Sequence, residues 1–293
     1  MAWRSHGKTN SELVQNLFTN GLIKSTRLVV SFGTSVRVLE AMKKVDRANY
    51  LPAGAGISYA YEDRPQAIGF NATISAPHMV TCKCPRKPAA VLEARLTRSW
   101  FVKLACDLES RNDVGSGSGY MVACFHHLVR GPAPDSSPPA IGFVLADRLS
   151  QVNMTGEIVG IEHIPELARQ SIDNLKKDGF GPSLENSEIC ISSEDGRNPD
   201  PGHGGAWDVI HVGAAAPTIP DSLLIQLNAP GRMFVPVYID QSYRSVLSHR
   251  SNQVGEDNQA IYQIDKHSDG SITQKELYGV RYVPLTSQEA QLK

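Results

Sequence analysis

DVGSGSGYMVACF, residues Asp113 to Phe125, is the segment from which the fold can be argued. Three glycines occupy alternate positions, Gly115, Gly117 and Gly119, and an amphipathic run follows them. A strand that enters a glycine-rich turn and then opens a helix lets a ligand come close to the backbone. The N–H groups at the start of the helix then face the bound molecule. We predict a ligand-binding loop here, although the glycines alone are also compatible with a flexible surface turn.

Acidic residues end the two strands that follow this loop. Glu162 ends the strand predicted in GEIVGIEH, where a carboxylate can accept hydrogen bonds from ribose hydroxyls. Asp195-Gly196 ends the strand predicted in SEICISSEDG, where it can reach an adenine edge. If Glu162 stood alone, a solvated strand end would explain it, and the alternative for the Asp-Gly pair is a plain turn. A proline- and serine-rich insert, residues 131–140, lengthens the path from the glycines to Glu162.

Helical and extended patterns alternate along the rest of the chain, which predicts an α/β fold with a parallel sheet covered by helices on both faces. Residues 62–79, punctuated by proline and glycine, predict a structured loop with short extended pieces. The other predicted helices cover 11–21, 35–45, 120–129, 165–179 and 221–227, and the other predicted strands cover 207–217, 231–237 and an antiparallel hairpin over 260–285. For the first helix, Asn10 or Ser11 is the expected N-cap.

Bulk composition excludes several classes of protein. The chain has 293 residues, 41% hydrophobic and 20% charged, with a net charge of −1. This near-neutral balance gives no reason to expect a nucleic-acid or membrane partner, and no apolar run has the length of a membrane helix. The first residues lack a signal core, so we expect a cytoplasmic protein with reduced thiols. Cys82 and Cys84 have no second ligand pair at metal spacing, so we expect no metal.

Seven blocks of the chain resemble the protein-L-isoaspartate (D-aspartate) O-methyltransferase family of class I S-adenosylmethionine-dependent methyltransferases. They are MAWRS, RPQAIGFNATISAPHM, DVGSGSGYMVACF, GEIVGIEH, EDGR, WDVIHVGAAAP and GVRYVPLT. ATISAPHM and VIHVGAAAP are specific to the family, whereas the glycine loop is typical of the whole class. The resemblance implies a Rossmann-like fold and methyl transfer from S-adenosyl-L-methionine to the α-carboxylate of L-isoaspartyl and D-aspartyl residues in damaged proteins and peptides. It also implies a repair enzyme, which we expect to be a monomer.

The same resemblance implies the site residues. Ser75 corresponds to the family's catalytic serine. The expected contacts of the methyl donor are Ala72, Thr73, Ile74, Ser75, Asp113, Gly115, Gly117, Glu162, His163, Asp195, Gly196 and Thr286.

The chemistry agrees with this assignment. The substrate carboxylate is already ionised at neutral pH, and a sulfonium donor is already activated, so no strong base or nucleophile is required. Alignment and exclusion of water are required instead. A hydroxyl such as that of Ser75 can orient one carboxylate oxygen, although a serine before Ala-Pro is by itself most often a turn residue. Ser75 is not a hydrolase nucleophile, because TISAP lacks the G-x-S-x-G turn.

Several segments depart from the family pattern. Val80 stands where relatives carry a histidine after APHM, and residues 80–112 do not resemble the family. Polar residues, among them Arg111 and Asn112, precede Asp113, although the first strand of this fold is central and should be apolar. Burying them without partners would cost several kcal/mol. We therefore predict that this polar stretch bulges after a strand in 100–108, or that the first strand is truncated.

We expect one methyltransferase domain over residues 1–293: helices and active-site loop in 1–79, an atypical segment in 80–112, a donor-binding core in 113–237 and a hairpin in 259–286. The unmatched segments have sharp edges, which suggests splicing or imperfect exon boundaries as their origin. This hypothesis predicts poor order in 80–112 and 131–151.

Four alternatives remain at this point. A nicotinamide dehydrogenase would require G-x-G-x-x-G, and the loop GAAAP offers it no evident proton-transfer residue. A nucleic-acid methyltransferase would require a polar-Pro-Pro-aromatic motif and basic grooves, and the sequence shows neither. DKHSDGSITQKE, residues 265–276, has the spacing of a calcium-binding EF-hand loop, but a β-hairpin turn around Asp269-Gly270 explains it better. The fourth alternative is a non-catalytic homologue of the same fold with a disrupted first strand.

Overall fold

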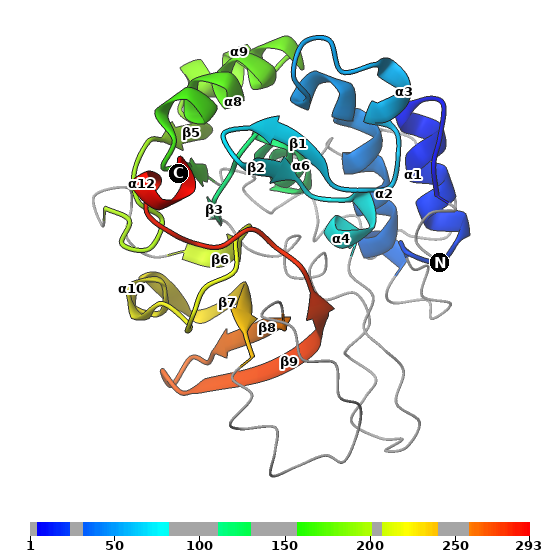
Figure 1. Cartoon of the computed structure of the whole chain (residues 1–293). Helices are drawn as coiled ribbons and strands as arrows, with labels where there is room; N and C mark the ends of the chain where they lie inside the picture. The colour runs from blue at the N-terminus through cyan, green and yellow to red at the C-terminus, as the bar shows by residue number, and fades with distance from the viewer. Residues whose placement is uncertain (1–4, 24–31, 82–110, 130–156, 201–206, 240–257) are drawn as a thin grey trace.

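The computed structural model describes the chain except for residues 1–4, 24–31, 82–110, 130–156, 201–206 and 240–257 (Figure 1). Its centre is a seven-stranded sheet with the order β5-β4-β3-β6-β7-β8-β9. The five strands from β5 to β7 are parallel, and the last two are antiparallel. Their bounds are β3 Arg111–Val114, β4 Ile158–Ile161, β5 Ile189–Ser192, β6 Trp207–Val212, β7 Leu227–Tyr238, β8 Gln259–Lys266 and β9 Ile272–Val280. The predicted α/β class with a C-terminal hairpin is confirmed.

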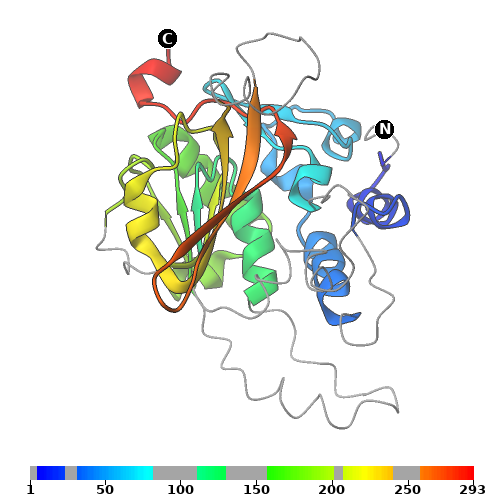
Figure 2. The ribbon, with the colours of Figure 1, turned by 90° about the horizontal axis from the view of Figure 1, so that it is seen from below.

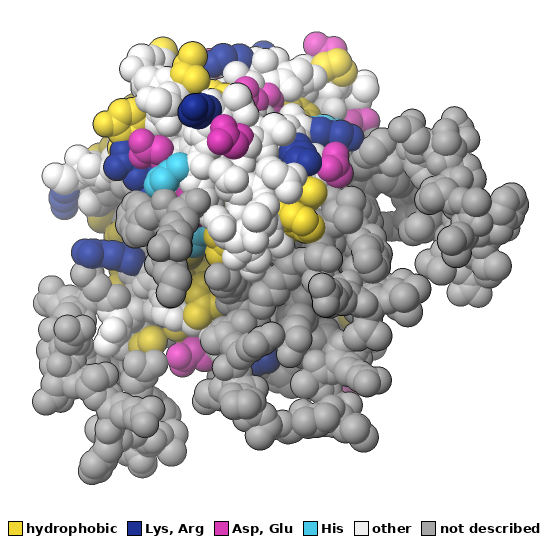
Figure 3. Space-filling model, turned by 90° about the vertical axis from the view of Figure 1, so that its right-hand side faces the viewer, with side chains coloured by type: hydrophobic (Ala, Val, Ile, Leu, Met, Phe, Trp, Pro, Cys, Tyr) yellow, Lys and Arg dark blue, Asp and Glu magenta, His cyan; other side chains and the backbone are white. Residues whose placement is uncertain are grey.

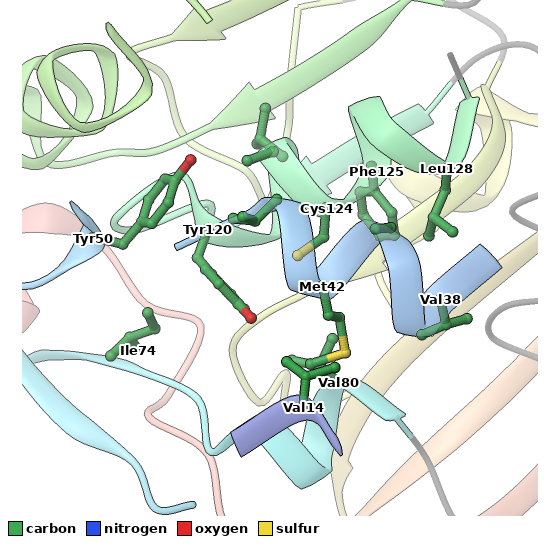
Figure 4. Packing of buried hydrophobic residues seen from close by; sticks show 14 of the residues in the cluster. Val14, Val38, Met42, Tyr50, Ile74, Val80, Tyr120, Cys124, Phe125 and Leu128 are labelled. Carbon is green, nitrogen blue, oxygen red and sulfur yellow. The ribbon is translucent and has the colours of Figure 1, made fainter. Parts of the chain in front are cut away.

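Helices cover both faces of the sheet (Figure 2). On one face lies α6, with α2 and then α1 packed outside it, and α8 contacts α6 on the same side. The opposite face is covered by α10, whose Leu223 joins the apolar cluster there. Figure 4 shows Met42 of α2, Val14 of α1 and Cys124 of α6 within one buried cluster. These helices are α1 Asn10–Thr19, α2 Phe32–Lys44, α6 Tyr120–Val129, α8 Pro165–Lys177 and α10 Asp221–Gln226.

Short helical elements complete the described chain. They are η2 Arg47–Tyr50, α3 Ile57–Ala60, α4 Pro77–Thr81, α9 Gly181–Glu185 and α12 Gln288–Gln291.

The N-cap of the first helix is Thr9, one residue before Asn10, the earlier of the two caps that we predicted. The Thr9 side chain accepts a hydrogen bond from the N–H of Glu12. Asn10 instead donates to the carbonyls of Met42 and Val45 at 2.9 and 3.0 Å, at the end of α2. A long-range bond to unpaired helix-end carbonyls therefore overrides the local capping preference.

Residues 62–79, predicted as a structured loop with short extended pieces, contain a small hairpin over 66–74, but residues 77–79 belong to α4, a helix that we did not predict. Strand β1, Gln66–Gly69, pairs with β2, Ala72–Ile74, in an antiparallel sheet of its own. The turn between them places Phe70 and Asn71 at φ angles of 51° and 57°, the left-handed pair that a tight type I′ hairpin requires. Ser75 and Ala76 then lead directly into α4.

Residues 265–276 also form a hairpin turn, between β8 and β9. Asp269 accepts the N–H of Ser271 at 2.9 Å, and Gly270 has a φ angle of 81°. Strands flank the turn on both sides, so the predicted hairpin is confirmed in place of the EF-hand loop.

In the first strand of the sheet, the bulge that we predicted at Arg111 and Asn112 is wrong, whereas the residues that would test a truncated strand lie outside the described ones. β3 contains Arg111 and Asn112, both fully buried, and pairs in register with β4 and β6. The Arg111 N–H donates to the carbonyl of Glu157 at 3.0 Å. The backbone hydrogen bonds to β4 and β6 extend from Val114 back to Arg111. Because these bonds involve the main chain, they form whatever the polarity of the side chains.

The candidate strand at 100–108 lies outside the described residues. So do 80–112 and 131–151, for which poor order was predicted, apart from residues 80, 81, 111 and 112, which lie in α4 and β3.

Candidate active site

The glycine loop joins the end of β3 to the start of α6, and its backbone shape explains the three glycines. Gly115, Gly117 and Gly119 have φ angles of 75°, 53° and 85°, in the left-handed region that glycine enters without steric cost. Gly115 donates its N–H to the carbonyl of Ile161 at 2.8 Å, which holds the loop against the end of β4. At Gly119 a Cβ would lie 2.5 Å from Ser171 Oγ, so a larger residue would require the Ser171 side chain in α8 to move.

Glu162, directly after β4, is the acidic residue tied to this loop. It is 4% exposed. Its Oε2 accepts the N–H of Gly117 at 2.9 Å, and its Oε1 accepts the N–H of Ile164 at 3.0 Å. Burial raises the pKa of the Glu162 carboxyl, and these two N–H groups oppose the shift. Each carboxylate oxygen keeps a lone pair for a further donor such as a ribose hydroxyl.

Asp195 and Gly196 follow β5 at the same edge of the sheet. Arg197 donates to Asp195 from Nε at 3.0 Å and from Nη2 at 2.6 Å, and these bonds hold the pKa of the Asp195 carboxyl below its usual range. A Cβ at Gly196 would collide with Cγ1 of Val114. Gly196 thus lets the loop after β5 rest on the end of β3, beside the glycine loop.

The β1–β2 hairpin lies over the glycine loop and carries the predicted catalytic serine. Ile68 of β1 is buried, and its Cδ1 lies 3.1 Å from the position that a Cβ on Gly117 would take. The predicted contacts Ala72–Ile74 make up β2 itself, with Thr73 exposed. Ser75 is half-buried and follows the strand directly.

A buried aspartate anchors the helix that follows Ser75. Asp63 accepts the N–H of His78 at 2.9 Å and lies 2.8 Å from its Nδ1. The N–H of Asp63 in turn lies 3.0 Å from Nδ1 of His6, its acceptor. The first turn of α4, and with it the position of Ser75, is therefore fixed from outside the motif. Sequence reasoning did not identify Asp63, since no local pattern relates it to His78.

Thr286 lies in the C-terminal tail, which runs beside the loop after β6. Leu285 donates its N–H to the carbonyl of Ala215 at 2.7 Å, and Ala215 donates to Val283 at 2.8 Å. Gly213 in the same loop donates to the carbonyl of Val114 at 2.8 Å. The tail thereby brings Thr286, which is half-buried, to the edge of the sheet that carries the glycine loop.

Gln291 in α12 connects two predicted donor-binding regions and was missed from the sequence. Its Oε1 lies 2.7 Å from Nε2 of His163, its Nε2 donates to the carbonyl of Phe70 at 2.8 Å, and its own carbonyl accepts from Asn71 at 2.7 Å. Figure 1 shows α12, in red, beside the turn of the β1–β2 hairpin. The C-terminus thus joins that turn to the residue after Glu162. Nothing in the sequence around Gln291 indicates this contact.

The arrangement suits an adenosyl sulfonium ligand. Gly115 is exposed and bare of side chain, Glu162 offers acceptor oxygens, and the hairpin with Ser75 covers the loop. Among the described residues, no group of three or more His, Cys, Asp or Glu side chains is placed to hold a metal ion. Within the same residues, no helix is both long and apolar enough to cross a membrane.

Comparison with known proteins places the chain in a family. The family described as protein-L-isoaspartate (D-aspartate) O-methyltransferase matches residues 8–134 and 142–290. The gap, residues 135–141, covers the last six residues of the proline- and serine-rich insert and the residue after it. Protein-L-isoaspartate O-methyltransferase of Caenorhabditis elegans is 37% identical over 99% of this chain and 98% of its own length. Protein-L-isoaspartate O-methyltransferase 1 of Arabidopsis thaliana is 35% identical over 97% and 94%.

A solved structure supports the same fold. The protein-L-isoaspartate O-methyltransferase structure from Plasmodium falciparum, in complex with S-adenosyl-L-homocysteine, superposes with a TM-score of 0.64. It is 23% identical and covers 95% of this chain and 98% of its own. Together with the matches in sequence, these findings show that the chain belongs to the protein-L-isoaspartate (D-aspartate) O-methyltransferase family.

Proposed function

We propose that this protein is a repair methyltransferase that acts on the α-carboxylate of L-isoaspartyl and D-aspartyl residues in damaged proteins and peptides. Its match to the family over nearly the whole chain supports this activity. The proposal rests on the packing of the β1–β2 hairpin, which Ser75 directly follows, onto the glycine loop. Ile68 contacts this loop at Gly117, whose N–H is bound by Glu162. A reacting carboxylate near Ser75 would thereby meet the donor site.

S-adenosyl-L-methionine, when bound, supplies an activated methyl group. We assign its contacts to the residues at the strand ends and in the hairpin. The Gly115 and Gly117 backbone leaves room for close approach, Glu162 accepts ribose hydroxyls, and Asp195-Gly196 borders the adenine. Ser75 orients one oxygen of the substrate carboxylate, and the hairpin excludes water. The remaining assigned contacts are Ala72, Thr73, Ile74, Asp113, His163 and Thr286.

We further propose a single domain over residues 1–293, which works as a cytoplasmic monomer without a nucleic-acid partner. Figure 3 shows acidic and basic side chains interspersed over the described part of one face, with no stripe of a single sign. The net charge of −1 agrees with this distribution.

No finding favours the non-catalytic alternative. That alternative was based on a disrupted first strand, and β3 pairs in register with both of its neighbours.

Methyl transfer to an isoaspartyl peptide, with its aspartyl twin as the control, tests the proposal. We expect labelling of the isoaspartyl peptide only, and equal labelling of both peptides would refute the repair assignment. Ser75→Ala should lower turnover more than donor affinity, because Ser75 is assigned to the reacting carboxylate. Loss of donor binding with unchanged turnover at saturating donor would contradict that role.

A further inference from the structure

One histidine at the end of β6 contacts the glycine-loop strand from the side. Asp113 and His211 lie opposite each other in the parallel pairing of β3 and β6. Nδ1 of His211 lies 2.6 Å from Oδ1 of Asp113, which is 1% exposed. The rings of His211 and Phe125 pack edge to face with their centroids 6.1 Å apart, and Met79 and Tyr282 line the narrow cleft beside them. The imidazole is therefore held from several sides.

Asp113 depends on this contact. A buried carboxylate is costly unless it is hydrogen-bonded, and its second oxygen, Oδ2, has no hydrogen-bonding partner among the described residues. The bond to His211 is the hydrogen bond of the Asp113 side chain that the described structure contains. Removal of the imidazole donor would leave the buried carboxylate without its hydrogen bond and free to rotate away from its place.

A displacement of Asp113 would pass directly to the glycine loop, which begins two residues later. β6 holds this end of β3 at a second point, where Gly213 donates to the carbonyl of Val114 at 2.8 Å. The fit there is tight, since a Cβ on Gly213 would lie 2.9 Å from the carbonyl oxygen of Gly115. The side chain of His211 and the backbone of Gly213 thus set where β3 stops and the loop starts.

We propose that His211 is a positioning residue for the methyl-donor site: it holds the buried Asp113 carboxylate and so fixes the glycine loop. This inference rests on the proposed assignment of that loop to the donor. It predicts that loss of the Nδ1 donor weakens donor binding and leaves peptide binding unchanged.

Two variants of similar shape test the proposal in the full chain. His211→Asn keeps an N–H donor at the position of Nδ1, whereas His211→Leu has the same branching and no donor. Binding of S-adenosyl-L-homocysteine is measured by calorimetry, and KM for an isoaspartyl peptide is measured at saturating donor. We expect His211→Leu to raise the Kd about tenfold, within the range for coupled neighbours, and His211→Asn to raise it less than about threefold. Peptide KM should change by less than about twofold in both.

The competing result is a purely structural histidine. If His211→Leu lowered the melting temperature while its Kd stayed at the wild-type value, or if both variants weakened binding equally, the proposal would be overturned. A wild-type chain that bound no S-adenosyl-L-homocysteine would overturn the proposed function, and this inference with it.

If His211→Leu fails to fold, the same substitution is tested in the Asp113→Asn variant. Asp113→Asn removes the buried charge, so the double variant with His211→Leu should fold. Its Kd should differ from that of Asp113→Asn alone by less than about twofold. A tenfold further loss in that background would show that His211 does not act through the carboxylate, and would overturn the proposal.

Discussion

The two ends of strand β3 bury polar side chains in different ways. At the carboxyl end, Asp113 is held by His211 from the neighbouring strand. Toward the amino end, the Asn112 amide is fully buried and has no hydrogen-bonding partner among the described residues. Its neighbours in register are Val159 and Ile210, both members of an apolar cluster. The polar side chain is thus supported at Asp113, where the donor loop starts, and is buried without such support at Asn112, the residue before it.

Glu162 extends the contrast on the carboxyl side. Both of its oxygens accept backbone N–H groups, one of them in the glycine loop. At the amino ends of the strands, His126 lies 3.1 Å from Glu188, the residue before β5. The ring of His126 also contacts the rings of His127 and Phe180. We therefore expect substitutions at the carboxyl end to change donor binding, and substitutions at the amino end to change stability alone.

The largest effect is expected from Glu162→Ala. It removes the acceptor of the Gly117 N–H and of the ribose hydroxyls, so donor affinity should fall by about 1–3 kcal/mol, the range for leaving buried polar groups without a partner. Glu162→Gln keeps one acceptor oxygen and should fall between the wild type and Ala. Calorimetry with S-adenosyl-L-homocysteine measures both.

Glu166→Ala is the matched control for this substitution. Glu166 lies four residues later in α8, pairs with Arg169 at 3.0 Å and has a side chain that is 45% exposed, so its loss should leave donor affinity unchanged. Equal effects of Glu162→Ala and Glu166→Ala would remove the contrast between the carboxyl end and the surface.

Much of the site could be predicted because it is local in sequence. A glycine that needs a positive φ, as at Gly115, and an acidic residue at a strand end, as at Glu162, both belong to a sequence pattern that their immediate neighbours complete. Gln291 and Asp63 belong to no such local pattern, since their partners lie far away along the chain.

The predicted bulge in the first strand was wrong for a related reason. Its polarity argued against a central strand, but the pairing of Asp113 opposite His211 fixes the register, and Arg111 and Asn112 follow the ladder. Register set by a functional turn therefore overrides the apolar pattern from which strands are usually recognised.

An intermediate, pH-dependent effect is expected at the amino end. Burial beside His126 lowers the pKa of His127 from 6.5 to about 4. Below pH 6.5 the unfolded chain takes up a proton that the folded chain refuses until about pH 4, so stability should fall as the pH falls through this window. Full linkage would be about 1.4 kcal/mol per pKa unit, and partial exposure of the ring reduces the expected loss to about 1–2 kcal/mol.

Urea unfolding at pH 7.5 and pH 5 measures this loss. His127→Gln should remove most of the difference between the two pH values, whereas His267→Gln, at an exposed histidine of the β8–β9 turn, should not. Donor affinity of His127→Gln at pH 7.5 should equal that of the wild type. An equal loss of stability in the wild type and His127→Gln would show that other groups carry the acid sensitivity.

The smallest effect, and the one of opposite sign, is expected from Asn112→Leu. Leucine has the branching of asparagine without its polar atoms, and it would contact Val159 and Ile210 in an apolar layer. Relief of an amide buried without a partner should stabilise the fold by about 1 kcal/mol. Donor affinity should stay within about twofold, because no bond joins the Asn112 side chain to the loop. Asn112→Asp, which buries a charge at the same place, should instead destabilise by about 2 kcal/mol or more. If Asn112→Leu lowered stability as Asn112→Asp does, the Asn112 amide would be as well supported as the Asp113 carboxylate, and the difference between the two ends of β3 would not hold.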